Sequence, residues 1–251
     1  MANVEIKLLS SLDKIFGNEI TLSPSRTFGS MLMNDLYSFQ IAVRSELPRV
    51  LRLKVISDAP LEIMIYKVGK VPCGLHIYGG MDDDDYISKE LKDFPDLLTG
   101  YEGSSFSSGT SWLAFWVTLK CTGYPSADPY NVVLSAENEN QQIMAAETFK
   151  ISIIKRELPK QKLIHTEWIY LDSIAQYYNI DLFSEKFWEL LANYLETASE
   201  FSMNMLLTPV LTPLLNTRPG VVRPDVQLTD VFYDNGRYTF GFDKLRRYIR
   251  L

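Results

Sequence analysis

The side chains that could bind or transform a polar ligand gather in the last third of the chain. His165 and Glu167 stand two positions apart in "KLIHTEWIY", a predicted β-strand, so alternation places them on one face and Trp168 on the other. An imidazole and a carboxylate on one face can hydrogen-bond to a polar substrate, or they can satisfy each other inside a core. The sequence leaves these two interpretations of the pair open. Trp168 could stack on a sugar ring, but we predict that it points toward the helices and is part of the core.

A long proline-rich segment, Asn204 to Val231, follows the start of a second predicted strand, "MNMLLTPV". Ordered loops of this length are uncommon unless they are functional, and prolines stiffen this one. Polar side chains that could line a ligand site there are Thr208, Thr212, Asn216, Arg223, Asp225, Gln227 and Asp230. They could equally satisfy turn backbone or pack on the rest of the protein. We predict a substrate-binding set of His165, Glu167, Thr208, Gln227 and Asp230.

Several kinds of chemistry are disfavoured by what the sequence lacks. No HxH, HExxH or CxxC pattern accompanies His76, His165, Cys73 and Cys121, so we expect no metal site, and both cysteines are predicted to be reduced thiols. The acidic run Asp82 to Asp85 lacks the spacing of a calcium loop and is predicted to be solvated. No Ser-His-Asp, P-loop or dinucleotide pattern is present, and no cofactor is expected.

Composition and charge narrow the class of protein. The chain has 251 residues, is 46% hydrophobic and carries a net charge of -6, so it can bury a large core and gains little from binding phosphates. We therefore expect no nucleic-acid partner. The first residues, "MANVEIKLLSSLDKIF", show no signal peptide, and no apolar run is long enough to span a bilayer. A cytoplasmic protein without a membrane partner is the expectation.

The first part of the chain predicts β-structure. Short segments rich in β-branched and aromatic residues alternate between apolar and polar positions and are separated by turn formers such as "SELP" and "SDAP". The predicted strands are Tyr37 to Val43, Val50 to Ile56, Leu61 to Val68, Ser111 to Cys121, Tyr130 to Glu137 and Glu147 to Ile154. Such a series indicates an antiparallel β-sandwich, with an acidic, Gly/Ser-rich insertion at 81–110.

The pattern changes after the charged segment "KRELPKQKL", the candidate linker, so we predict domains at 1–157 and 158–251. In the second, strand, helix and strand form a predicted βαβ unit. Asp172, Ser184 and Asp243 are predicted helix caps, and Ser184 begins an amphipathic helix. Asn235-Gly236 predicts the turn of a hairpin in "VFYDNGRYTFGF".

Polar residues near the carboxyl ends of parallel strands, followed by a long loop, are typical of the active face of a (β/α)8 barrel. Only its first βα units are present. The predicted fold class is therefore α+β with two domains, an antiparallel β-sandwich followed by the beginning of an incomplete TIM-type barrel. We expect such a truncated chain to expose apolar surface and to aggregate or pair with itself.

The quoted pieces "HTEWIYLDSIAQYYNIDLFSEKFWELLANYL", "NMLLTPVLTPLLNT", "RPDVQLTDV" and "NGRYTFGFDKLRRYI" resemble the start of the catalytic barrel of glycoside hydrolase family 123. The segments "NDLYSFQIAV" and "WLAFWVTLKCTGYPSADPYNVVL" resemble its amino-terminal sandwich. The resemblance implies a β-N-acetylgalactosaminidase-like enzyme that acts on glycans ending in an N-acetylhexosamine. It also implies substrate-assisted, retaining hydrolysis, an exception to the usual two-carboxylate scheme.

In that family an Asp-Glu pair on a later barrel strand supplies the catalytic carboxylates, and no position of this chain matches the pair. We therefore predict no catalytic residue here and an inactive isolated chain. The competing hypothesis is a non-enzymatic β-sandwich that binds carbohydrate or a protein. Trp112 and Trp116 share a strand face and would serve such a module if they were exposed, whereas burial would make the sandwich a scaffold.

Overall fold

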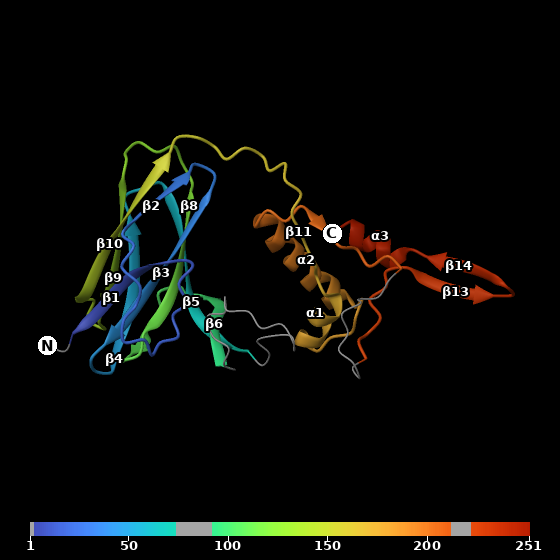
Figure 1. Ribbon diagram of the computed structural model, residues 1–251, viewed down its shortest axis with the longest axis horizontal. Coiled ribbons are helices and arrows are strands. Elements are labelled where there is room, and N and C mark those ends of the chain that lie inside the picture. The colour runs from blue at the N-terminus through green and yellow to red at the C-terminus, as the bar shows by residue number, and fades with distance from the viewer. Residues whose placement is uncertain (1–2, 74–91, 212–221) are drawn as a thin grey trace, which may run out of the picture. The chain divides into compact units, whose positions relative to one another are not determined.

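A computed structural model describes residues 3–73, 92–211 and 222–251, which divide between two units, Met1–Pro159 and Lys160–Leu251 (Figure 1). Each unit has its own hydrophobic core, so we describe each one by itself. Several residues singled out in the sequence lie outside the described residues: His76, Asp82 to Asp85, Thr212 and Asn216.

In the residues of unit 1 that the structure describes, the strands form two five-stranded sheets. The first has the order β1-β3-β8-β5-β6, with bounds Val4–Ser10, Leu36–Ser45, Leu113–Cys121, Leu61–Cys73 and Lys92–Gly100. The second has the order β2-β10-β9-β4-β7, with bounds Phe28–Leu32, Ile143–Ile154, Tyr130–Glu137, Arg49–Ser57 and Phe106–Ser108. All six predicted strands are present, and the predicted β-sandwich is confirmed.

The structure also differs from the predicted sandwich in detail. One pairing is parallel, that of β2 with β10, whereas every other neighbouring pair within the two sheets is antiparallel. Part of the predicted insertion at 81–110 is regular structure, because β6 extends the first sheet beside β5 and β7 pairs with β4. β6 and β7 are strands because they hydrogen-bond to neighbouring strands, and the local sequence gives no sign of that pairing.

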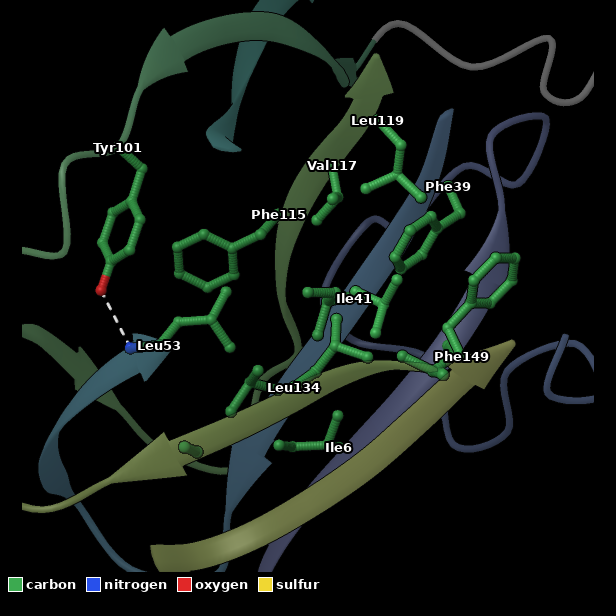
Figure 2. Packing of buried hydrophobic residues seen from close by; sticks show 14 of the residues in the cluster. Ile6, Phe39, Ile41, Leu53, Tyr101, Phe115, Val117, Leu119, Leu134 and Phe149 are labelled. Atoms are coloured by element: carbon green, nitrogen blue, oxygen red, sulfur yellow. Dashed lines mark hydrogen bonds between the residues drawn. The ribbon is translucent and has the colours of Figure 1, made fainter. Parts of the chain in front are cut away.

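The core of unit 1 lies between the sheets and is rich in aromatic side chains (Figure 2). Phe39 of β3 and Phe149 of β10 stack with ring centroids 4.4 Å apart and an interplanar angle of 8°. Both are fully buried, as is Phe115 of β8. The alternating apolar residues of these strands meet here, which is what makes the two sheets a single layered body.

The segment after β1 covers part of the outer face of the first sheet. Ile15 packs there in a small apolar cluster with Ala42 and Trp112. The buried amide of Gln40 donates to the backbone oxygens of Ser10 (3.0 Å) and Asp13 (2.7 Å), so its burial is compensated. Trp112 is only 6% exposed, which makes the sandwich a scaffold at this position and argues against a binding strip formed with Trp116.

The described part of unit 2 combines two short sheets with three helices. Its elements are β11 (Thr166–Glu167), α1 (Leu171–Tyr178), α2 (Glu185–Glu200), β12 (Met205–Leu206), β13 (Asp230–Asp234), β14 (Arg237–Gly241) and α3 (Asp243–Ile249). β11 and β12 pair in parallel, which confirms the predicted βαβ connection. A closed barrel stays a prediction, because the described part of unit 2 contains only this one parallel pair.

The helix caps test three predictions from the sequence. The Ser184 hydroxyl accepts a hydrogen bond from the Phe187 backbone N–H at 3.2 Å, so the predicted cap of α2 is confirmed. The other two predictions are wrong, since Tyr170 and Phe242 occupy the cap positions and Asp172 and Asp243 lie in the first turns. A carboxylate in the first turn of a helix interacts favourably with the helix dipole. An acidic residue near the start of a helix is therefore expected both at the cap position and in the first turn, and the sequence does not distinguish the two.

The predicted hairpin is confirmed. β13 and β14 are antiparallel, and Asn235 and Gly236 have φ values of 47° and 76°, as a two-residue turn of this kind requires. Among the helices in the described ranges, none combines the length and the apolar character that crossing a membrane would need.

The hydroxyl of Tyr101 links two segments of unit 1 inside the core (Figure 2). It accepts a hydrogen bond from the Leu53 N–H at 2.9 Å and donates to the Ser104 carbonyl at 2.7 Å. Burial raises the pKa of Tyr101, although the Leu53 N–H acts in the opposite direction.

We therefore expect Tyr101→Phe to lower the free energy of unfolding of unit 1 by about 1–3 kcal/mol, because it leaves a buried N–H without its acceptor. Urea denaturation followed by circular dichroism would measure the change. The matched control is Tyr124→Phe, since Tyr124 is exposed and its hydroxyl should contribute little. Equal effects of the two substitutions would contradict this account.

Candidate functional site

The short parallel pair of unit 2 is held in register by one side chain. The Asn204 Oδ1 accepts from the His165 backbone N–H, and its Nδ2 donates to the Leu163 carbonyl, both at 2.9 Å. A side-chain amide thus supplies hydrogen bonds that strands of two residues cannot supply themselves. It fixes the position from which His165 and Glu167 project.

The structure brings His165 and Glu167 together. Nε2 of His165 lies 3.2 Å from Oε1 of Glu167, and both side chains are partly open to solvent. They line a pocket of about 560 Å³ together with residues of α2, including Tyr194, and with Phe201 just after that helix. The pair therefore forms the polar part of a largely apolar pocket, not a satisfied pair inside a core.

The face of β11 that carries the pair is directed toward α2. Ile169, which continues this face, lines the same pocket and packs with the core of unit 2. Leu206, opposite Glu167 in the parallel register, packs with that core as well. If Trp168 pointed toward the helices, alternation would put His165 and Glu167 on the face away from them, whereas the packing of Ile169 and Leu206 shows the opposite arrangement.

Trp168 consequently lies on the other face of the two-stranded sheet formed by β11 and β12. We expected it to be buried against the helices, but it is 61% exposed, and this prediction is wrong. Its neighbours across the register, Met205 and Leu207, are also exposed. The face of the β11–β12 sheet that is turned away from α2 therefore presents apolar side chains.

Two tyrosines form a second polar group in the pocket. The hydroxyl oxygens of Tyr178 and Tyr194 are 3.3 Å apart, with Tyr178 at the end of α1 and Tyr194 in the middle of α2. The hydrogen bond to Tyr178, followed by burial, raises the pKa of Tyr194 to about 12. Sequence reasoning missed this pair because the helical pattern identified Tyr194 only as part of an apolar face.

An ion pair joins the first turn of α1 to the loop that follows β12. Arg223 donates to both carboxylate oxygens of Asp172, with Nε to Oδ2 at 2.7 Å and Nη2 to Oδ1 at 2.6 Å. The Asp172 side chain is almost completely buried, and the Arg223 guanidinium also lies 4.9 Å from the centre of the Tyr170 ring. The bond to Asp172 raises the pKa of Arg223. Asp172 thus anchors the loop segment that carries Arg223. The sequence around Asp172 gave no indication of this role.

The other predicted ligand-binding residues do not line this pocket. Thr208 bonds to the hydroxyl of Tyr248. Burial raises the pKa of Tyr248, although the bond to Thr208 acts in the opposite direction. The Gln227 amide donates to the Thr229 carbonyl at 2.6 Å, and the Lys244 ammonium donates to Asp230 at 2.6 Å. The three side chains are therefore used within unit 2. In the described ranges, no three His, Cys, Asp or Glu side chains are grouped in a way that could hold a metal ion.

The tyrosine pair gives a direct test of the pocket geometry. We expect Tyr178→Phe to lower the pKa of Tyr194 from about 12 toward the ordinary tyrosine value, because the substitution removes the hydroxyl that bonds to it. NMR titration of tyrosines labelled at Cζ, with Tyr194 assigned through Tyr194→Phe, would measure it. Tyr177→Phe is the control, and an unchanged Tyr194 pKa in Tyr178→Phe would refute the bond.

The ion pair gives a second test. We expect Asp172→Asn to lower the free energy of unfolding of unit 2 by about 3–5 kcal/mol, because it leaves the Arg223 charge without its buried partner. Urea denaturation would measure the loss. Glu189→Gln breaks the exposed pair with Lys186 and should cost about 0–1 kcal/mol. A loss for Asp172→Asn no larger than that of the control would contradict an anchoring role.

Most of unit 2 is similar to a domain of known proteins. Residues 168–251 match the family model described as the catalytic domain of glycoside hydrolase 123. A family 123 glycoside hydrolase from Clostridium perfringens, studied for the hydrolysis of glycolipid glycans, has a similar structure. The TM-score is 0.71 with 17% sequence identity, over 99% of this chain and 44% of that one. The chain thus spans less than half the length of that enzyme.

Two further structures overlap with part of the chain. The N-terminal domain of PorA covers 59% of this chain and 97% of its own length, with 8% identity and a TM-score of 0.27. A PapD-like domain of human CEP192 covers 62% of this chain and 87% of its own length, with 10% identity and a TM-score of 0.28. Scores this low support no argument. None of the curated proteins matches the chain.

The fold shared with the Clostridium perfringens enzyme covers nearly the whole chain, and the family model covers β12, the hairpin and all three helices of unit 2. The resemblance of this protein to glycoside hydrolase family 123 is therefore confirmed.

Proposed function

We propose that this chain is part of a glycoside hydrolase that removes terminal N-acetylhexosamine residues, of the N-acetylgalactosamine type, from glycans. The observation that carries the proposal is the catalytic-domain match at residues 168–251. Within this range the chain forms the helices, loops and second parallel strand of the predicted barrel start. A complete barrel would place its active face at the carboxyl ends of these strands. The glycans of glycolipids, on which the Clostridium perfringens enzyme acts, are a candidate substrate class.

The proposed reaction is substrate-assisted. The acetamido oxygen of the sugar attacks the anomeric carbon as the glycosidic bond breaks, and an acidic side chain protonates the departing oxygen. A second carboxylate orients the acetamide, and water then opens the cyclic intermediate with net retention of configuration. The resemblance assigns these roles to an Asp-Glu pair that matches no position in this chain, so we propose that the chain contributes substrate contacts and no catalytic residue.

We propose His165 and Glu167 as sugar contacts in the pocket beside α2, on the face of the strands that a barrel would turn toward its helices. Their pocket combines hydrogen-bonding groups with the rings of Tyr178 and Tyr194, and sugar sites need both kinds of surface. Thr208, Gln227 and Asp230 remain proposed contacts, although each would have to exchange a present partner for a substrate hydroxyl.

An assay of two forms of the protein tests the function. We expect the 251-residue chain to release no nitrophenol from 4-nitrophenyl β-N-acetylgalactosaminide, because the carboxylate pair is missing. The protein isolated from its source organism should hydrolyse this substrate, and a thiazoline that mimics the cyclic intermediate should inhibit it.

The matched control substrate is the corresponding β-galactoside, which lacks the acetamido group and should not be cleaved. Equal cleavage of both substrates would rule out substrate assistance. Hydrolysis by the 251-residue chain would show that a catalytic acid lies within it. Failure of the natively isolated protein on every N-acetylhexosaminide would refute the proposed activity.

A further inference from the structure

The β13–β14 hairpin concentrates exposed aromatic side chains on one element of unit 2. Figure 1 shows it extending away from the helices of that unit. Nearly every residue of both strands is exposed, although the hairpin contains four aromatic side chains. Exposed aromatic side chains concentrated on one element indicate an interaction site.

The two faces of the hairpin have different compositions. In the observed register Val231 lies opposite Phe240 and Tyr233 opposite Tyr238, so these four side chains share one face. With Phe242, which stacks on Phe240 at 6.4 Å, they form what we call the aromatic face.

The other face, which we call the charged face, carries Asp230, Phe232, Asp234, Arg237 and Thr239. All the charged side chains of β13 and β14 lie on it. Its one aromatic residue, Phe232, lies opposite Thr239. The charged side chains and most of the aromatic rings therefore lie on opposite faces of the hairpin. This alternation is typical of antiparallel strands that have one covered face and one face in contact with solvent.

The aromatic face is open over a large area. Val231 is 44% exposed, Tyr233 and Tyr238 are each 65% exposed, and Phe240 is 51% exposed. Phe242 is 40% exposed. Since a covered aromatic side chain buries about 150–250 Å², these fractions give the five residues of the face an exposed area of roughly 500 Å² in total.

We propose that the aromatic face is an interface between two copies of this chain, with the two hairpins packed aromatic face on aromatic face about a two-fold axis. Covering both copies buries about 1,000 Å², the lower bound for a specific interface. A face without charges is compatible with a copy of itself, because the symmetry brings no like charges together. A glycan would require more hydrogen-bonding groups beside the rings, and this face offers only the hydroxyls of Tyr233 and Tyr238.

Sedimentation equilibrium of the 251-residue chain tests the interface. We expect the average mass to rise with concentration from that of the monomer toward twice that value. Tyr238→Lys places a charge on the aromatic face near its copy and should weaken the dimer about tenfold or more. Thr239→Lys adds the same side chain at the next position, on the charged face, and should leave the dimer intact.

Tyr233→Lys repeats the test from the opposite strand, so that a folding defect of one variant, detected by circular dichroism, does not decide the result. A wild-type chain that stays monomeric at every concentration would overturn the proposal and would favour another partner for the hairpin. An assembly that Tyr238→Lys and Thr239→Lys affect equally would also overturn it. Neither result depends on the proposed hydrolase activity.

Discussion

Unit 2 depends on the return of the long loop into its core. A parallel pair of two residues per strand has too few hydrogen bonds to be stable alone. Val226 and Leu228, on the returning segment, are fully buried against α1 and α2 and supply the missing apolar contacts. The ion pair of Arg223 with Asp172 fixes the same segment from its polar side. The described end of the loop, from residue 222 onward, therefore has a structural role in closing the core of unit 2.

This closure explains where the polar residues of unit 2 are used. The backbone N–H of Leu228 donates to Pro209, and that of Thr229 donates to Val210, so the loop ends beside the strand from which it started. The Gln227 amide bonds to the Thr229 carbonyl, and Asp230 pairs with Lys244 of α3. His165 and Glu167 are the exception, because they remain accessible in the pocket beside α2. A binding function is best supported where polar groups are not already committed to the fold.

The two units differ in how completely their apolar residues are covered. Unit 1 encloses its core between two sheets, and even the outer face of one sheet is partly covered by the segment that carries Ile15. Unit 2 leaves Trp168, Met205 and the aromatic face of the hairpin open. If the catalytic domain is a barrel, as the resemblance implies, further strands would cover the face that carries Trp168. The hairpin projects from the unit, so its cover is a separate question.

The sequence by itself determined the elements with strong local signals. The six alternating strands, the amphipathic α2 with its Ser184 cap and the Asn235-Gly236 hairpin depend on contacts a few residues apart, and all were predicted. Tertiary structure decided what depends on partners distant in the sequence. It recruited β6 and β7 as strands, buried Asp172 against Arg223 and directed His165 and Glu167 toward α2. Alternation specifies that two faces of a strand differ, but only packing decides which face a helix covers, and that choice determined the candidate site.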